Sequence, residues 1–197
     1  MKHNIDSDEE IWFSQWLDEL VEAGYVIDYT DAKTYLLAPK LEYQYLEQKK
    51  TKSTLKEQSL MQQHVYTSDF DIRWNKKALG IFINTPMSIS ELNEDSTICK
   101  SNVVNNKLDK DLFIKCGETM LVEIKGTFNR FGGEKENAIN RKWLFQKHGI
   151  YTNLVKVPDI FAKTFTPKKF LLTKTGKQRT IHFKIKTLKE YINERNS

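Results

Sequence analysis

The chain has 197 residues, of which 39% are hydrophobic and 29% charged, an ordinary composition for one soluble globular domain. No apolar run approaches the ~20 residues that a membrane helix requires, and MKHNIDSDEE has no apolar core, so we expect neither a membrane span nor a secretory signal. The net charge is +5, but residues 160–189 contain nine Lys or Arg and no Asp or Glu, which leaves −4 for the rest. This asymmetry predicts an anionic partner, with nucleic acid first and an acidic membrane surface second. The alternative is that these basic side chains only keep the protein soluble and bind no partner.

Cysteine and histidine are too sparse for a metal-binding framework. Cys99 and Cys116 lack the spacing of metal ligands, and the four histidines are scattered singly. We therefore expect free thiols, as in a reducing cytoplasm.

The segment 7–24, SDEEIWFSQWLDELVEAG, predicts the first helix. Ser7 and Glu10 have the spacing of a capping box, and Gly24 is a suitable end. At about 100° per residue, Glu9 and Glu10 both fall within the angular range of the apolar stripe, so either carboxylate would point toward the core. A purely capping glutamate is the alternative. The stripe consists of Phe13, Trp16, Leu17, Leu20 and Val21.

The next part of the chain predicts strands separated by polar segments. Residues 33–47 have the aromatic and aliphatic content of a strand that is interrupted by Pro39. Residues 47–60 are polar and are expected to form a loop or an extended connection. Residues 76–112 are expected to be an inserted loop or a small excursion from the main fold.

Two predicted strands carry acidic side chains. In 61–75, MQQHVYTSDFDIRWN, alternation places Ser68, Phe70, Ile72 and Trp74 on one face and Thr67, Asp69, Asp71 and Arg73 on the other. In 119–128, TMLVEIKGTF, Glu123 and Lys125 share one face of an otherwise apolar segment. The ordinary explanation for these two charges is an ion pair on a solvated edge strand. The more specific explanation is that the two side chains are catalytic.

A second helix and another strand follow. Residues 132–149 predict a helix that ends at its final glycine, and residues 150–158 predict a strand stopped by Pro158. The apolar face of the helix is predicted to comprise Ala138, Ile139, Trp143 and Leu144.

The end of the chain predicts a basic appendage. Residues 168–186 have the pattern of a β-hairpin with its turn near Thr175 and Gly176, and residues 187–196 predict a short helix. The order of elements indicates a mixed α/β fold, with one central sheet flanked by helices.

Asp69, Glu123 and Lys125 together suit metal-assisted phosphodiester hydrolysis. Two nearby carboxylates raise each other's pKa unless a cation neutralises them, and hard oxygen ligands suit Mg²⁺. The ion would lower the pKa of a bound water, and a lysine beside it could contact the phosphate. The acid-x-Lys spacing alone is a weak signal, because it occurs as Asp31-Ala-Lys33, Glu47-Gln-Lys49 and Glu123-Ile-Lys125.

Three short motifs in this order resemble the PD-(D/E)xK nuclease superfamily. They are Ser7-x-x-Glu10, YTSDF at 66–70 and VEIKG at 122–126. Within that superfamily the chain is similar to phage-type Holliday-junction-resolving endonucleases and to the end-cleaving endonucleases of some transposons.

The resemblance implies roles for individual residues. Glu10, Asp69 and Glu123 would be metal-site carboxylates, completed by the main-chain carbonyl of Ile124, and Lys125 would be the catalytic lysine. The implied metal is Mg²⁺, for which Mn²⁺ is expected to substitute.

Some positions depart from the family pattern or compete for these roles. Ser68 stands where the family usually has proline, and 53 residues separate the two strand acids, more than a compact member needs. Glu9 competes with Glu10, and Asp71 shares the face of Asp69 as a secondary candidate ligand.

The resemblance also implies a domain organisation. Residues 1–157 would form an αβββαβ core like that of restriction endonucleases, with 76–112 as an insertion. Residues 158–197 would form a basic C-terminal extension made of a β-hairpin and a helix.

The expected DNA contacts lie after the catalytic strand and in the basic extension. A helix that follows the site is well placed to reach the flanking phosphates, although a solvated helix face is the alternative for any one residue. We expect Trp74 and Trp143 to be core residues rather than base-stacking ones. The candidate contacts are Arg130, Lys135, Arg141, Lys142, Lys147, Lys168 and Lys169.

The leading hypothesis is a metal-dependent DNA endonuclease of phage or mobile-element type, acting on branched or otherwise distinctive DNA in the cytoplasm of a host cell. Junction resolution would favour a homodimer, because two symmetric cuts need two sites. The alternatives are a noncatalytic DNA-binding or virion-associated protein that uses the fold as a scaffold, and a restriction- or replication-linked nuclease.

Overall fold

The structure is a computed structural model that describes residues 7–84, 87–92, 96–101, 108–125 and 133–197. Its elements are α1 (Asp8–Glu22), β1 (Val26–Ala38), β2 (Leu41–Gln48), β3 (Ser53–Met61), β4 (His64–Trp74), the 3-10 turn η1 (Lys76–Ala78), β5 (Met87–Leu92), β6 (Thr97–Ser101), β7 (Leu121–Ile124), α2 (Gly133–His148), β8 (Thr152–Val155), α3 (Val157–Lys163), the 3-10 turn η2 (Lys168–Leu171) and α4 (Leu188–Asn196).

The central sheet has four strands in the order β1-β4-β7-β8. β4 pairs antiparallel with both β1 and β7, whereas β7 and β8 are parallel and are joined through α2. A parallel pair requires such a crossover connection. The predicted mixed α/β class is therefore confirmed, and β7 is an interior strand rather than an edge.

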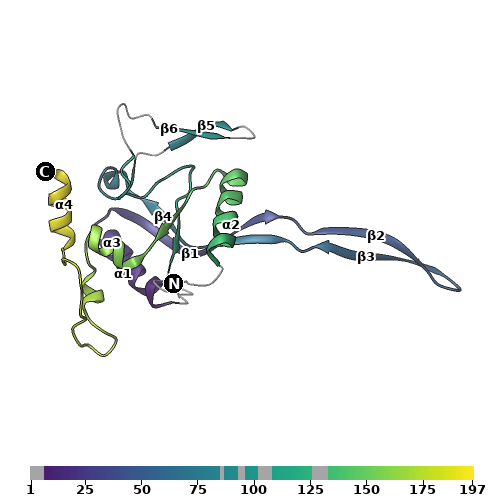
Figure 1. The fold of residues 1–197 in the computed structure, drawn as a ribbon, viewed down its shortest axis with the longest axis horizontal. Coiled ribbons are helices and arrows are strands. Elements are labelled where there is room, and N and C mark those ends of the chain that lie inside the picture. Colours follow the sequence, from purple (N-terminus) through teal and green to yellow (C-terminus); the bar gives the residue numbers. More distant parts are fainter. Residues whose placement is uncertain (1–6, 85–86, 93–95, 102–107, 126–132) are drawn as a thin grey trace.

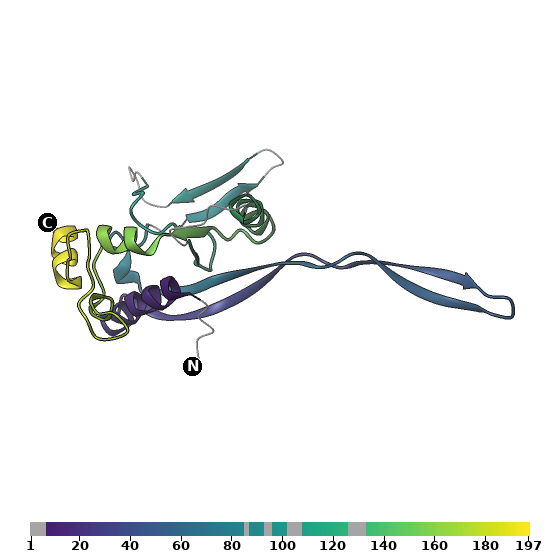
Figure 2. The same cartoon turned by 60° about the horizontal axis from the view of Figure 1, so that its bottom comes forward.

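Helices cover both sides of this sheet, with α1 on one side and α2 on the other (Figure 2). The α1 side holds the larger hydrophobic cluster, which includes Phe13 and Phe70, together with residues of α3 and α4. The α2 side holds a smaller cluster formed by Leu37, Tyr66, Leu121, Leu144 and Ile150.

The first helix forms where the sequence predicts it. Ser7 caps it by accepting a hydrogen bond from the Glu10 backbone N–H at 3.2 Å. Gly24 follows the helix with a φ of 70°, a conformation that glycine adopts without a steric penalty. The predicted apolar stripe is buried except at Val21, which is exposed.

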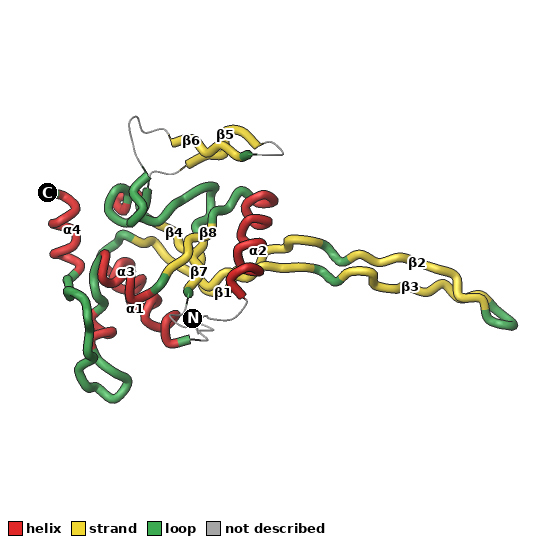
Figure 3. The backbone as a smooth tube through the Cα atoms, viewed as in Figure 1, coloured by secondary structure: helices red, strands yellow, loops and turns green. Residues whose placement is uncertain are grey.

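A long two-stranded ribbon, β2–β3, projects from the end of β1 and β4 (Figure 3). Residues 47–60 are therefore mostly strand, so the extended alternative of the prediction holds and the loop is confined to residues 49–52. Their side chains are mostly polar, and even Leu55 and Leu60 are exposed, so the alternating pattern of a half-buried strand is missing. Pro39 lies between β1 and β2, where its lack of an N–H breaks the ladder.

The predicted excursion at 76–112 contains the turn η1 and the small hairpin β5–β6. Cys99 of this hairpin lies with its Sγ 2.9 Å from that of Cys116, and both cysteines are free thiols, as expected.

The C-terminal part differs from the prediction in two ways. Pro158 lies in the first turn of α3, a helix that the sequence analysis missed. The predicted hairpin over 168–186 forms only in a short version: an antiparallel bridge joins Leu172 and Gln178 around the predicted turn, and no named strand extends it to 186. The predicted terminal helix is confirmed, with a capping box between Thr187 and Glu190.

The C-terminal segment belongs to the main core. Phe161, Phe165, Phe170 and Tyr191 are buried in the same cluster as the residues of α1 and β4, so residue 157 does not mark a boundary between two cores. No helix among the described residues is long and apolar enough to cross a membrane.

The two tryptophan predictions have different outcomes. Trp74 is buried in the core as predicted, but Trp143 is exposed and stacks on His64 with their ring centroids 5.4 Å apart. Leu144 is the fully buried residue of the predicted α2 face, whereas Ile139 is exposed and was wrongly predicted.

Candidate active site

The register of β4 and β7 brings two acids together. Phe70 pairs with Val122 and Asp71 with Leu121, so the next position of this antiparallel ladder places Asp69 opposite Glu123. Directly opposed residues in such a pair lie on the same face. The Ile124 N–H also donates to Asp69 Oδ2 at 2.5 Å, which fixes this carboxylate against β7.

Three donors from three parts of the fold hold Glu123. Its Oε1 accepts hydrogen bonds from Lys125 Nζ at 3.0 Å and from Asn137 Nδ2 of α2 at 2.6 Å. Its Oε2 accepts one from the Tyr66 hydroxyl at 2.8 Å. Because β7 is interior and this ion pair is largely buried, the alternative of a solvated edge strand is wrong.

The protonation of Asp69 is strongly perturbed. Burial raises its pKa to about 7, and the charge of Glu123 and, more weakly, that of Glu10 push in the same direction. The bond from the Ile124 N–H and the charge of Lys125 oppose this rise. Perturbation by burial and specific charges is typical of functional sites, although structural networks show it too.

Glu10, in the first turn of α1, acts on Asp69 through its charge, but among the described side chains it does not form a three-acid group with Asp69 and Glu123. Ser7 Oγ donates to Glu10 Oε1 at 2.8 Å, so Glu10 takes part in the helix start. Its charge also raises the pKa of Asp69, which favours Glu10 over Glu9 as the glutamate on the site side. The capping and site interpretations are therefore compatible.

Asp69 and Glu123 are the residues best placed to hold a divalent ion. In the described part of the chain, no three His, Cys, Asp or Glu side chains lie close enough together to form a metal site. Mg²⁺ needs only one or two protein carboxylates, with water and phosphate as the remaining ligands. Burial first and the charge of Glu123 second raise the pKa of Asp69, and a bound cation would stabilise its ionised form against both, so this donor set fits the ion. Oε1 of Glu123 accepts two hydrogen bonds and Oε2 accepts one, so Oε2 keeps a lone pair that an ion could use.

Asp71 does not join these acids. Its Oδ2 forms an ion pair with Lys33 Nζ of β1 at 2.9 Å, which ties the two strands together.

A cavity of about 770 Å³ opens beside Lys125, between α2, α3 and the segment 110–114. Its cations outnumber its acids, and Asp111 is neutralised by Lys163 at 2.9 Å. Such a lining suits a phosphate-bearing ligand. The charged residues of the lining are Lys110, Asp111, Lys125, Arg141, Lys156, Asp159 and Lys163.

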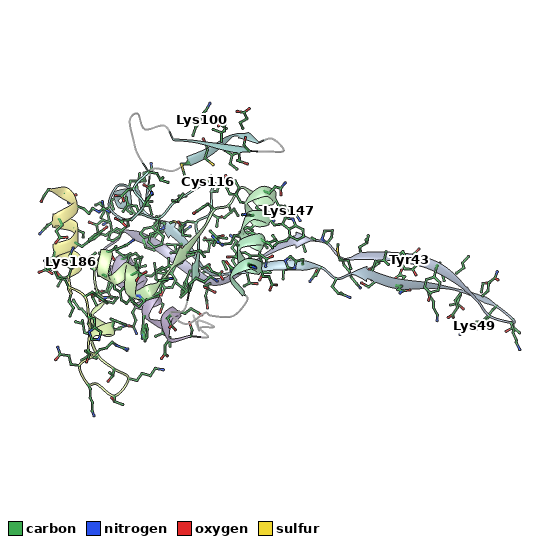
Figure 4. All side chains as sticks on the ribbon, viewed as in Figure 1. Tyr43, Lys49, Lys100, Cys116, Lys147 and Lys186 are labelled. Atoms are coloured by element: carbon green, nitrogen blue, oxygen red, sulfur yellow. The ribbon has the colours of Figure 1, made fainter. Side chains whose placement is uncertain are left out.

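The predicted DNA contacts on α2 fall into different environments. Arg141 lines the cavity and donates from Nε to Asn137 Oδ1 at 3.0 Å, which links it through Asn137 to Glu123. Lys135 and Lys142 are exposed on the helix. Lys147 instead donates to the Leu37 carbonyl at 3.0 Å and so attaches α2 to β1 near the base of the ribbon (Figure 4). Arg130 lies outside the described residues.

The predicted contacts in the basic segment are not part of the cavity. Lys168 and Lys169 are exposed on η2, beside α1, where the Lys168 N–H donates to Glu19 Oε1 at 2.6 Å. Lys174 reaches the first turn of α1 and pairs with Asp8 at 2.7 Å. The basic segment therefore lies along α1, from Glu19 to its first turn.

Sequence reasoning missed the residues that position Glu123. Tyr66 stands in the YTSDF stretch, three residues before Asp69, but its buried hydroxyl gave no signal of its partner. Asn137 lies four residues before Arg141, a helical spacing that could have linked these two side chains. Lys110 and Lys156 come from segments whose meeting at the cavity depends on the tertiary fold.

No family model matches the chain, and no solved structure matches it.

Proposed function

We propose that this chain is a metal-dependent endonuclease that hydrolyses phosphodiester bonds in DNA and is related to the PD-(D/E)xK nucleases. The observation that carries the proposal is the opposition of Asp69 and Glu123 on interior strands, with Lys125 bound to Glu123 beside a cation-lined cavity. A binding scaffold would have no reason to place two repelling carboxylates next to a phosphate.

The order of elements supports the relationship. Without the ribbon β2–β3 and the hairpin β5–β6, the chain runs α1, β1, β4, β7, α2, β8, which is the αβββαβ order expected of a restriction-endonuclease-like core. The ribbon and the hairpin are then insertions on either side of β4.

In this proposal Asp69 and Glu123 would hold Mg²⁺ (or Mn²⁺) together with the carbonyl of Ile124, and Glu10 would act on the site through its charge from the first turn of α1. The ion, when bound, would lower the pKa of an attacking water and offset charge on the phosphate. The Lys125 ammonium contacts the phosphate or orients the water, because Glu123 fixes it at 3.0 Å.

The remaining features of the proposal follow from the resemblance and from charge. In detail, we propose that the protein comes from a phage or mobile element, prefers branched DNA, acts as a homodimer and works in the cytoplasm of the host cell. A noncatalytic DNA-binding scaffold is the second candidate, favoured by the three hydrogen bonds that hold Glu123 within the protein.

The decisive experiment is a cleavage assay with linear duplex, single-stranded DNA, a four-way junction and RNA, each with Mg²⁺ and with EDTA. We expect Mg²⁺-dependent cleavage of DNA that Asp69→Asn or Glu123→Gln abolishes while DNA binding is kept. Asp71→Asn is the matched control, since Asp71 lies on the same strand but is paired with Lys33. Cutting at the normal rate by either site variant would reject the assignment, and binding without cleavage by the wild type would favour the scaffold.

A further inference from the structure

The ribbon β2–β3 extends far from the body of the molecule, on the side opposite α4 (Figure 1). A two-stranded ribbon without a third strand or a covering helix is marginally stable alone in water. This ribbon exposes both of its faces, including the cross-strand pair Leu46 and Leu55, at 68% and 59% exposure. A segment of this kind gains stability from a partner.

The root of the ribbon is anchored to α2, the helix that also positions Glu123. His64 Nε2 and Asn140 Oδ1 form a hydrogen bond of 2.8 Å, and the His64 ring stacks on Trp143. Lys147 and His148 bond to the carbonyls at the end of β1. The ribbon therefore has a fixed root beside the candidate site and a free tip.

Charge is unevenly distributed along the ribbon. The outer part, residues 47–56, contains four lysines and a single acid, Glu47, which pairs with Lys56 at 2.7 Å. Among the described residues, neither Lys50 nor Lys52 makes an ion pair. In the inner part Lys40 pairs with Glu42, and Glu57 accepts a hydrogen bond from the uncharged Gln44, so this part carries a net charge of −1. The ribbon therefore has a cationic tip on a weakly acidic stem.

These observations favour duplex DNA over a second copy of the chain as the partner. The tip is complementary to a polyanion, whereas two such tips would repel each other. The major groove of DNA is about 12 Å wide and admits a two-stranded β-ribbon.

We infer that β2–β3 is a DNA-binding arm that contacts the duplex beyond the cleavage site, with Lys50 and Lys52 on its phosphates. The inference rests on the proposed function in taking DNA as the substrate. The eight residues of β2, the shorter strand of the arm, span about 27 Å, which corresponds to about eight base pairs at 3.4 Å each.

The test measures DNA binding by the full chain carrying Glu123→Gln, in EDTA, by fluorescence anisotropy over a range of salt concentrations. Adding Lys50→Gln and Lys52→Gln should raise Kd on the order of tenfold at 0.1 M salt and reduce the salt slope by about two. The matched control, Lys76→Gln with Lys100→Gln, removes two exposed lysines elsewhere and should leave both values unchanged.

A shortened arm provides the second measurement. In the ladder Tyr43 faces Gln58, so replacing residues 44–57 with an Asn-Gly turn closes a short hairpin at this pair. The hydroxyl-radical footprint should then lose several base pairs on one side. An unchanged footprint and salt slope would overturn the inference. A second result would also overturn it. If the shortened arm converts a dimer to a monomer in light scattering while the DNA affinity per protomer stays unchanged, the arm binds a second copy of the chain.

Parallel cleavage assays with the unmutated catalytic residues separate the two proposals. If the wild type cleaves DNA and the arm variants bind like it, the arm inference fails while the nuclease function stands. If nothing cleaves but binding depends on the arm, the nuclease function fails and the arm inference stands.

Discussion

The same three-residue pattern occurs in the candidate site and in the ribbon, with different consequences. Glu123 and Lys125 are 3.0 Å apart with exposed side-chain fractions of 12% and 17%, whereas Glu47 and Lys49 are 3.6 Å apart with 32% and 59%. Exposed pairs of this kind contribute little energy because water and salt screen them. The comparison teaches that burial on an interior strand, not the acid-x-Lys spacing, makes such a pair a candidate for catalysis.

Removing the two lysines should give the largest contrast. Lys125→Ala should reduce the single-turnover cleavage rate at saturating DNA by about two to three orders of magnitude, because it removes a charged group from the reacting phosphate. Lys49→Ala should leave that rate unchanged, since Lys49 lies near the arm's tip (Figure 4). Circular dichroism controls for folding. Equal rates for the two variants would break the comparison.

Two tyrosines offer a finer contrast. The Tyr66 hydroxyl donates to Glu123 Oε2 at 2.8 Å, and the Tyr43 hydroxyl donates to Gln58 Oε1 at 2.9 Å. Tyr66→Phe should cost about tenfold or more in Mg²⁺ affinity, measured by calorimetry, because it frees the carboxylate to rotate. Tyr43→Phe should leave this affinity unchanged. If Tyr66→Phe binds Mg²⁺ as the wild type does, this hydroxyl does not position a metal ligand.

The pH dependence of stability should show the smallest effect. Burial and Glu123 raise the pKa of Asp69 from 3.8 to about 7, whereas Lys56 lowers the pKa of the exposed Glu47. Between pH 3.8 and about 7, Asp69 is protonated in the folded chain but ionised in the unfolded chain. The stability from this group is therefore complete below about pH 4 and is lost as the pH rises through about 7.

The measurement is Tm in EDTA between pH 5 and 8. Asp69→Asn should flatten the fall in Tm seen in the wild type, and Glu47→Gln should not. Mg²⁺ should raise the wild-type Tm more at pH 8 than at pH 5, because it binds the ionised carboxylates. A wild-type Tm that rises steadily with pH would contradict the raised pKa.

Local patterns predicted the elements whose side chains meet the core. The stripe of α1 and the alternation of β4 were readable because one face of each is buried. The ribbon lacks a buried face, so its sequence resembles a loop. Pro158 was interpreted as the end of a strand, although proline is equally favoured in the first turn of a helix.

The predicted hairpin over 168–186 stays short for a tertiary reason. Pairing is confined to the bridge between Leu172 and Gln178 and the backbone bonds around it, because Phe170 packs on Trp12 and Phe161 instead of extending a strand. Arg179, predicted only as part of a basic surface, stacks over the rings of Trp12 and Phe170 at 4.7 Å.

The candidate site was predictable only in part. The strand pattern and the resemblance together singled out Asp69, Glu123 and Lys125, and the register places the two acids opposite each other. Tyr66 and Asn137 could not be assigned, because their contact with Glu123 depends on how β4 and α2 pack against β7.

The neighbouring thiols of Cys99 and Cys116 have a practical consequence for any sample of this protein. Burial and the adjacent sulfur raise the pKa of Cys116 to about 12. The thiol is therefore protonated at neutral pH and reacts slowly, because the thiolate is the reactive form. Prolonged storage without reductant could nevertheless join the two sulfurs and staple the β5–β6 hairpin to the segment before β7. Preparations should therefore be compared at a matched oxidation state, with thiol titration alongside each assay.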